Sequence, residues 1–438
     1  MKHIFHLTFA LLAGMALCAC SSDDPMDNDQ TAVPVQPGET SSDDTWSVKI
    51  EGDMTRGLSL SGTTLTPNFN GENIYVYYGD TKVGTLTASS GTGNLVLSGR
   101  LSNASYTEGQ NLNLYFLKDK GFATYTGQQG TIANIASNFD FATATGAISD
   151  VDENTHTLTI GKANFTGQQA VVALQFSEAL NSGDVITISG GGLKSNVTVT
   201  TQSAVAASSG VVYAALPLNT SSSARTFSIS IARSSTTVLK GTISGAAAMA
   251  NGKYYTAKKV TLSRHMSLAK SSDKGDWIAD DGFIYDSGST FPSGRTKTGV
   301  IVYVGTGTGD SSRKHGIALS LTNGSNTNYT TNATTIKGSL ASVPSGASAW
   351  IIPSINQWNT ILISLKGGSG LTESANSAYV NVNPGGGATN LNQIYWSTTA
   401  TGSKNWCYRA TSGHGYKIAQ GTGSGDSYKD YIRAIYTF

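Results

Sequence analysis

The stretch Trp46-Ser47-Val48-Lys49-Ile50 decides the fold class of this chain, because large apolar residues alternate in it with polar ones. A repeat of two residues is the period of a strand that turns one face to a core and the other to solvent. The same alternation returns along most of the chain: 74–78, 95–97, 112–116, 156–160, 171–176, 185–187, 211–215, 227–231 and 238–243. The pattern predicts a mainly β protein.

The composition supports this expectation. Of 438 residues, 50 are glycine, 39% are hydrophobic and only 13% are charged, which is about half the usual charged share. Such a chain suits short strands joined by polar turns, and it excludes an all-α protein and a coiled coil. The formal net charge is +1 and the chain contains no run of five or more Lys or Arg residues, so no nucleic-acid partner is expected.

The beginning of the chain is typical of a secretory leader. Lys2 precedes the apolar stretch Ile4–Leu17, which is long enough for a signal peptide and too short to span a bilayer. It ends in Leu17-Cys18-Ala19-Cys20, which resembles a bacterial lipobox. The resemblance implies that residues 1–19 are a lipoprotein signal peptide and that Cys20 carries the lipid. The alternative is an ordinary signal peptide that ends near two cysteines.

Residues 20–45 are expected to form an acidic flexible tether. Ser21-Ser22-Asp23-Asp24 resembles the acidic export tag of surface lipoproteins of Bacteroidota, although a merely acidic tether is the alternative. The resemblance implies a surface-exposed location in the cell outer membrane. With Cys18 removed and Cys20 lipidated, Cys407 is the last of the three cysteines, so no intrachain disulfide can form.

Composition divides the rest of the chain into three expected domains. Residues 46–145 and 146–265 both show short strands at the spacing of β-sandwiches, and we expect the boundary in the featureless stretch 142–150. Residues 266–438 carry five of the six tryptophans, long glycine-rich loops and one expected helix at about 354–365. These tryptophans could be core residues or a platform that stacks sugars, and the core is the favoured interpretation for most of them.

The segment 46–263 resembles the fimbrillin-like family, the subunits of type V pili of Bacteroidota. The matching pieces occur in this order: Thr55-Arg56, 74–78, 170–176, 212–217, 252–255 and 260–262. The resemblance implies two tandem transthyretin-like β-sandwiches. It also implies assembly by donor-strand complementation, in which a protease cuts after an early arginine, the first strand leaves with the lipid, and another subunit fills the groove.

Arg56 is the candidate processing site, because it follows the first strand in a turn-like sequence. Removal of that strand would expose a cavity filled by Trp46, Val48 and Ile50. A donated strand could refill the cavity and supply main-chain hydrogen bonds. The alternative is that Arg56 is a solvated loop residue in a lipoprotein that is never cut.

The segment 276–438 resembles a domain related in fold to C-type lectins and formylglycine-generating enzymes. The matching pieces are 275–277, 281–282, 299–304, 315–316, 350–354, 357–359, 395–399, 405–409 and 432–435. The resemblance implies a loop-rich α+β C-type-lectin-like domain. The chain lacks the disulfides and the calcium motif of true C-type lectins, and it has one cysteine where formylglycine enzymes need a pair. We therefore expect no metal, no cofactor and no enzymatic activity.

The final segment 431–438 alternates like a strand, and the lectin-like fold would use it internally. A subunit without a strand to lend can only end a polymer, so the expected function is that of a fimbrial tip adhesin. Its ligand surface is expected to include Trp406, Tyr408, Arg409, His414 and Tyr416. The expected partners are other fimbrial subunits, the outer membrane before processing, and a glycan or a host or bacterial surface ligand. Two alternatives stay open: a permanently lipid-anchored glycan-binding lipoprotein, and a pilus anchor or structural subunit.

Overall fold

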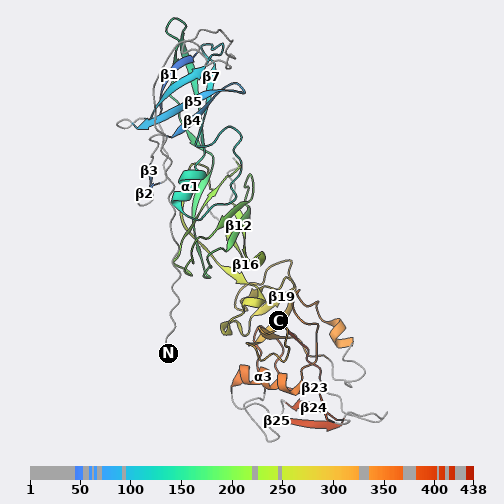
Figure 1. Ribbon diagram of the computed structural model, residues 1–438. Coiled ribbons are helices and arrows are strands. Elements are labelled where there is room, and N and C mark those ends of the chain that lie inside the picture. Colours follow the sequence, from blue (N-terminus) through green and yellow to red (C-terminus); the bar gives the residue numbers. More distant parts are fainter. Residues whose placement is uncertain are drawn as a thin grey trace, which may run out of the picture. The chain divides into compact units, whose positions relative to one another are not determined.

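The computed structural model describes most of the chain from Thr45 to Phe438, and these residues belong to one compact unit (Figure 1). The described residues are 45–52, 59–61, 64–66, 72–90, 95–219, 225–244, 249–324, 335–367, 381–401, 404–409, 414–419 and 431–438. They are mainly β, which confirms the expected fold class. The expected signal peptide, the tether and Cys20 lie outside the described residues.

The first sheet closes on itself. It contains β1 (Thr45–Gly52), β4 (Asn73–Tyr78), β5 (Thr81–Ser90), β6 (Leu95–Ser102), β7 (Asn111–Phe116), β8 (Ala142–Asp152), β9 (Thr157–Ile160) and β10 (Thr166–Gly167). The strand order is β10-β8-β7-β4-β5-β6-β1-β9, and β9 pairs in turn with β8. The first half of β8 pairs with β7 and its second half pairs with β9, so β8 completes the ring. A separate short pair consists of β2 (Ser59–Ser61) and β3 (Thr64–Thr66).

The course of β8 corrects the expected domain boundary. The boundary was placed in 142–150, yet these residues are strand, and the first core continues through Leu158 and Phe165. Tyr125 and Phe139, which precede the expected boundary, belong to the second core. The strand escaped the sequence pattern because two of its inward residues are alanines, whose apolar signal is weak.

The second core lies between two sheets. One has the order β14 (Val212–Leu216), β11 (Ala170–Phe176), β17 (Tyr254–Val260). The other has the order β13 (Val197–Thr200), β12 (Val185–Gly190), β15 (Thr226–Arg233), β16 (Thr236–Ser244), β18 (Leu262–Arg264). Inward residues of both sheets form one cluster, which also takes in Ile135 of α1 (Ile132–Asn138). This part is a β-sandwich; the transthyretin-like relationship stays a prediction.

The last part of the chain combines two sheets with a helix. The larger sheet has the order β20 (Ile284–Tyr285), β19 (Trp277–Ala279), β21 (Lys297–Val304), β22 (Gly316–Leu319), β26 (Ile435–Thr437). The smaller has the order β23 (Ile394–Thr401), β24 (Lys404–Arg409), β25 (His414–Ala419). Two short turns, η2 (Met266–Leu268) and η3 (Ser271–Asp273), precede them. The lectin-like relationship of this part stays a prediction.

The expected helix is confirmed as α3 (Ile355–Lys366). It begins after Ser354, whose side chain accepts a hydrogen bond from the backbone N–H of Gln357, while the backbone N–H of Ser354 donates to the side-chain oxygen of Gln357. This reciprocal pair is a capping box, which fixes the start of a helix. Trp358 and Ile361 of α3 are completely buried against β21 and β22.

The tryptophans of this part are core residues wherever the structure describes their side chains. The four that it describes are at most 8% exposed: Trp277, Trp350, Trp358 and Trp396. The favoured interpretation is therefore confirmed for these four. The side chain of the fifth, Trp406, lies outside the described part of the chain.

Candidate functional site

Strand β1 is bonded along both of its edges. It runs antiparallel to β6 from the pair Thr45 and Ser102 to the pair Gly52 and Leu95. On its other edge it runs parallel to β9, with Val48 opposite Leu158. The backbone N–H of Ser47 also donates to the carbonyl of His156 at 2.8 Å. Strand β1 is therefore an interior strand of the closed sheet, although it is the first strand of the described chain.

The inner face of β1 fills the first core. Trp46, Val48 and Ile50 are 7%, 3% and 0% exposed, whereas Ser47 and Lys49 between them are exposed. This confirms the expected burial of the three apolar side chains. At about 1.5–3 kcal/mol for each large apolar side chain, their burial contributes roughly 5–9 kcal/mol.

Trp46 occupies an aromatic site at one end of β1. Its ring stacks on the imidazole of His156 at 5.2 Å between centroids and meets the ring of Tyr106 edge-on at 5.5 Å. Its indole N–H donates to Oδ1 of Asn103 at 3.2 Å. The Tyr106 hydroxyl donates in turn to the carbonyl of Ser102 at 2.7 Å, and burial raises the pKa of Tyr106 to about 12.

The structure does not describe the expected processing site. Arg56 falls in the segment 53–58, which lies outside the described residues. The segment directly follows β1, which ends at Gly52. Cleavage at Arg56 therefore stays a prediction, as does lipidation at Cys20.

The final strand is built into the last part of the chain. Strand β26 pairs antiparallel with β22, and Ile351 forms a bridge to Ile435 on its other edge. The backbone N–H of Phe438 donates to the carbonyl of Gly316 at 3.1 Å. All residues from 432 to 438 are buried. The expectation that this segment is an internal strand is confirmed.

Arg433 lies beside β26 and is completely buried. Its guanidinium donates to Oδ1 of Asn323 at 2.7 Å and to the carbonyl of Leu321 at 3.3 Å. Burial lowers the pKa of Arg433 to about 10, because the charged form loses its hydration. The two hydrogen bonds fasten the final segment to the strand-end residues after β22.

The expected ligand residues lie on one hairpin. Strand β24 carries Trp406, Tyr408 and Arg409, and β25 carries His414 and Tyr416. The backbone register places Arg409 opposite His414 and Cys407 opposite Tyr416. Trp406 and Tyr408 occupy the alternate positions of β24, opposite Lys417 and Gly415. Arg409, His414 and Tyr416 therefore belong to one set of alternating register positions in the hairpin. Trp406 and Tyr408 belong to the other set. Their role as a ligand surface stays a prediction.

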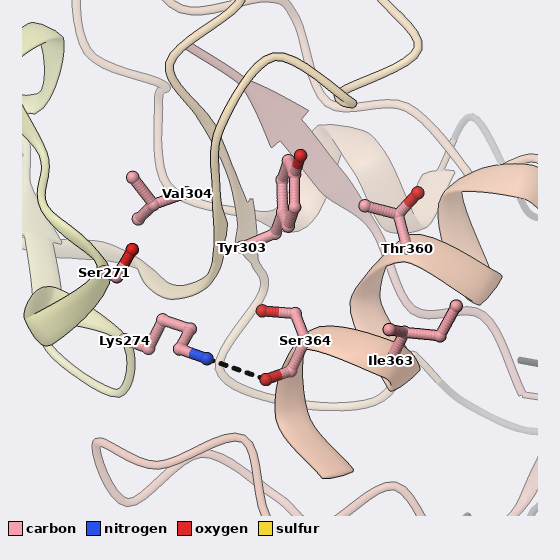
Figure 2. A pocket seen from close by; sticks show the side chains of 7 residues that line it. All are labelled: Ser271, Lys274, Tyr303, Val304, Thr360, Ile363 and Ser364. Atoms are coloured by element: carbon pink, nitrogen blue, oxygen red, sulfur yellow. Dashed lines mark hydrogen bonds between the residues drawn. The ribbon is translucent and has the colours of Figure 1, made fainter. Parts of the chain in front are cut away.

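A pocket lies between α3 and the end of β21 (Figure 2). It has a volume of about 310 Å³ and is lined by Ser271, Lys274, Tyr303, Val304, Thr360, Ile363 and Ser364. The Lys274 ammonium donates to the backbone carbonyl of Ser364 at 2.8 Å. Ile363 presents an apolar surface that is 40% exposed. The volume is at the lower end of small-molecule sites. No motif in the sequence indicated this pocket, because its residues come from separate segments.

Two further findings concern ions and membranes. Among the residues that the structure describes, no group of three or more His, Cys, Asp or Glu side chains is placed to hold a metal ion. Within the same ranges, no helix has the length and apolar character needed to cross a bilayer.

The comparisons with known proteins show remote likenesses. No protein-family model matches the chain, and no curated protein does. Among solved structures, fimbrilin FimA of Porphyromonas gingivalis is 11% identical, with 59% of this chain and 82% of that chain covered and a TM-score of 0.26. The fimbrial anchor protein Mfa2 of the same organism is 11% identical, with 44% and 81% covered and a TM-score of 0.24. Its tip fimbrial protein Mfa3 is 9% identical, with 47% and 84% covered and a TM-score of 0.22. At TM-scores this low, the likenesses are not evidence for function.

Proposed function

We propose that the chain is a surface-exposed fimbrial subunit whose first strand is removed by cleavage after Arg56 and replaced by a strand from another subunit. The position of β1 is the observation that carries this proposal. β1 lies between β6 and β9 in a closed sheet and buries Trp46, Val48 and Ile50. It is also the first strand of the described chain, so one cut in the segment after it separates it from every other strand.

Removal of β1 would open the sheet at one place. Neighbouring strands lie about 4.8 Å apart, so β6 and β9 would face each other across a gap of roughly 9.5 Å, which one strand fills. Both new edges would carry unpaired backbone groups, and the apolar core residues that β1 covers would be exposed to water. A strand from another subunit supplies the missing hydrogen bonds and the missing apolar side chains together.

We infer a position at the tip of the fimbrium from the final strand. Residues 432–438 are buried, and this segment is hydrogen-bonded on both edges, so lending it to another subunit would dismantle the core around Tyr436. This segment is therefore unsuited to be a donor. The last part of the chain would then face outward as an adhesin, with the β24–β25 hairpin as the ligand surface.

Mass spectrometry of surface material tests the processing step and separates the alternatives. A mature N-terminus at Gly57 supports the proposed subunit. A population that retains Cys20 with its lipid would instead favour the permanently anchored glycan-binding lipoprotein or the pilus anchor.

A glycan array probed with the full chain tests the adhesin role. We expect Arg409→Ala and His414→Ala to reduce binding, because these residues lie opposite each other in the backbone register of the hairpin. Lys274→Ala examines the pocket beside α3 as a second ligand site. Lys194→Ala, an exposed lysine of the β-sandwich, is the control for loss of a positive charge. Binding that none of the hairpin variants changes would remove the hairpin from the proposal.

A further inference from the structure

We propose that the slot left by β1 selects its replacement by an aromatic side chain at the position of Trp46, and that tryptophan fits this position best. The preferred strand runs parallel to β9 and carries aliphatic residues two and four positions after the aromatic one. This inference rests on the proposed strand exchange, and it specifies the chemistry of the partner strand.

The walls of the Trp46 site stay in place when β1 leaves. Asn103 and Tyr106 follow β6, and His156 lies in the turn between β8 and β9. The Tyr106 ring is fixed by its hydroxyl bond to Ser102 and by contact with the ring of Tyr78 at 5.2 Å. None of these residues belongs to the strand that is removed.

The turn that carries His156 is also fixed. The Asp152 carboxylate accepts hydrogen bonds from the backbone N–H of Asn154 at 2.9 Å and from the Thr155 hydroxyl at 2.7 Å. His156 itself has a φ of +48°, a conformation that is uncommon for residues other than glycine and is held here by the turn. The imidazole is therefore presented to the slot before any strand arrives.

An indole matches these walls better than other side chains do. Its flat ring stacks on His156 and receives the edge of Tyr106, whereas an aliphatic side chain would form neither contact. Its N–H reaches Asn103 at 3.2 Å, a bond that phenylalanine cannot form. Because Asn103 is exposed, this bond adds a small preference to the larger one for an aromatic ring.

The other two inward positions of the slot differ from the first. Val48 lies opposite Gly99, which has no side chain, and Ile50 lies opposite Leu97, which is buried. The slot therefore has an aromatic end and an aliphatic end, and a reversed strand would place its aromatic residue at the aliphatic end. The outward positions, such as Ser47, face solvent and impose no comparable demand.

The test exchanges β1 for labelled peptides. In the full chain, a recognition sequence for a site-specific protease replaces residues 53–58, and the cut protein is titrated with peptides of sequence 45–52. We expect the native peptide to exchange with the resident strand. Trp46→Ala in the peptide should weaken binding by about a hundredfold or more, and Trp46→Phe by about threefold. The peptide with Ser47→Ala is the matched control and should bind like the native one.

Substitutions in the protein test whether His156 causes the preference for tryptophan at the position of Trp46. His156→Asn keeps a residue that tolerates the left-handed turn and removes the stacking partner. It should weaken the native peptide about threefold to tenfold and leave the Trp46→Ala peptide unchanged. Glu153→Ala, exposed in the same turn, should leave both peptides unchanged.

The outcomes separate the inference from the proposed function. If the native and Trp46→Ala peptides bind within about twofold of each other, the aromatic selection is overturned while strand exchange stands. If no peptide displaces the resident strand after the cut, strand exchange itself fails, and the inference that rests on it fails as well.

Discussion

At the scale of residues, Trp46 shows what alternation along a strand can and cannot predict. The repeat of two residues correctly predicted that Trp46, Val48 and Ile50 share a buried face. It could not predict that Trp46 meets His156 and Tyr106, because the pairing of strands far apart in sequence is not encoded in any single strand. The aromatic site is therefore a property of the folded sheet.

We expect Trp46→Ala in the uncut chain to destabilise the first core by about 3–5 kcal/mol, since the substitution leaves a cavity beside His156 and Tyr106. Ser47→Ala, on the exposed face of the same strand, should change stability by less than about 0.5 kcal/mol. Hydrogen exchange of the amides of β6, measured at increasing urea concentrations, gives the free energy of unfolding of the first core in both variants. Equal stability of the two would show that Trp46 is not a packing residue.

A second expectation concerns His265, whose backbone N–H donates to the carbonyl of Val238 at 2.8 Å and whose Nδ1 lies 2.9 Å from the Ser267 hydroxyl. Burial lowers the pKa of His265 below its usual 6.5. The unfolded chain therefore takes up this proton at a higher pH than the folded chain does. Stability should fall as pH drops through about 6.5 and below.

Thermal unfolding measured from pH 7.5 to pH 5 checks this sign. We expect the melting temperature of the native chain to fall over that range, and His265→Asn to reduce the fall. An equal pH dependence in the variant would assign the effect to other groups.

At the scale of elements, β8 marks the limit of the sequence pattern. Strands with large apolar residues, such as β11, and helix α3 with its capping box were predicted from the sequence close to their observed positions. Strand β8 was missed because its inward residues Ala142 and Ala144 are small. The closure of the sheet depends on this strand, so its absence from the prediction also misplaced the domain boundary.

The closure has a steric requirement at Gly146 of β8. A Cβ atom there would lie 2.7 Å from Cγ2 of Ile160 in β9. We expect Gly146→Val to push β9 away and to destabilise the first core by about 1–3 kcal/mol. Thr145→Val, at an exposed position of the same strand, is the control. Hydrogen exchange of the amides of β9 reads out the loosening, and unchanged protection would contradict the closed sheet.

Strand β26, unlike β1 in its proposed role, is a permanent part of its own core, because all of its residues are buried there. We expect a chain that ends at residue 430 to lose the fold of residues 266–430, since Ile435, Tyr436 and Phe438 are all buried. Limited proteolysis should then degrade this part while the first two cores stay resistant. Unchanged resistance throughout would mean that the segment is dispensable and could be lent to a neighbour.

At the scale of the whole molecule, the first part of the described chain is a closed sheet, and β26 in its last part is paired within its own sheet. The sequence indicated a detachable first strand and an internal last strand. The pairing of β26 confirms the internal last strand, whereas detachment of β1 stays a prediction. The ligand site was less predictable. The pocket beside α3 draws its residues from three segments, and no local pattern brings such segments together.

The most direct test of the account is a photo-crosslinking residue at Ser98 in fimbriae on living cells. Ser98 is exposed and lies between Lys49 of β1 and Thr87 of β5, so a crosslink from this position to any strand other than β5 identifies the strand that occupies the slot. We expect mass spectrometry to find Ser98 joined to a peptide of another subunit in material that begins at Gly57. Crosslinks that join Ser98 only to residues 45–52 of the same chain would contradict the account.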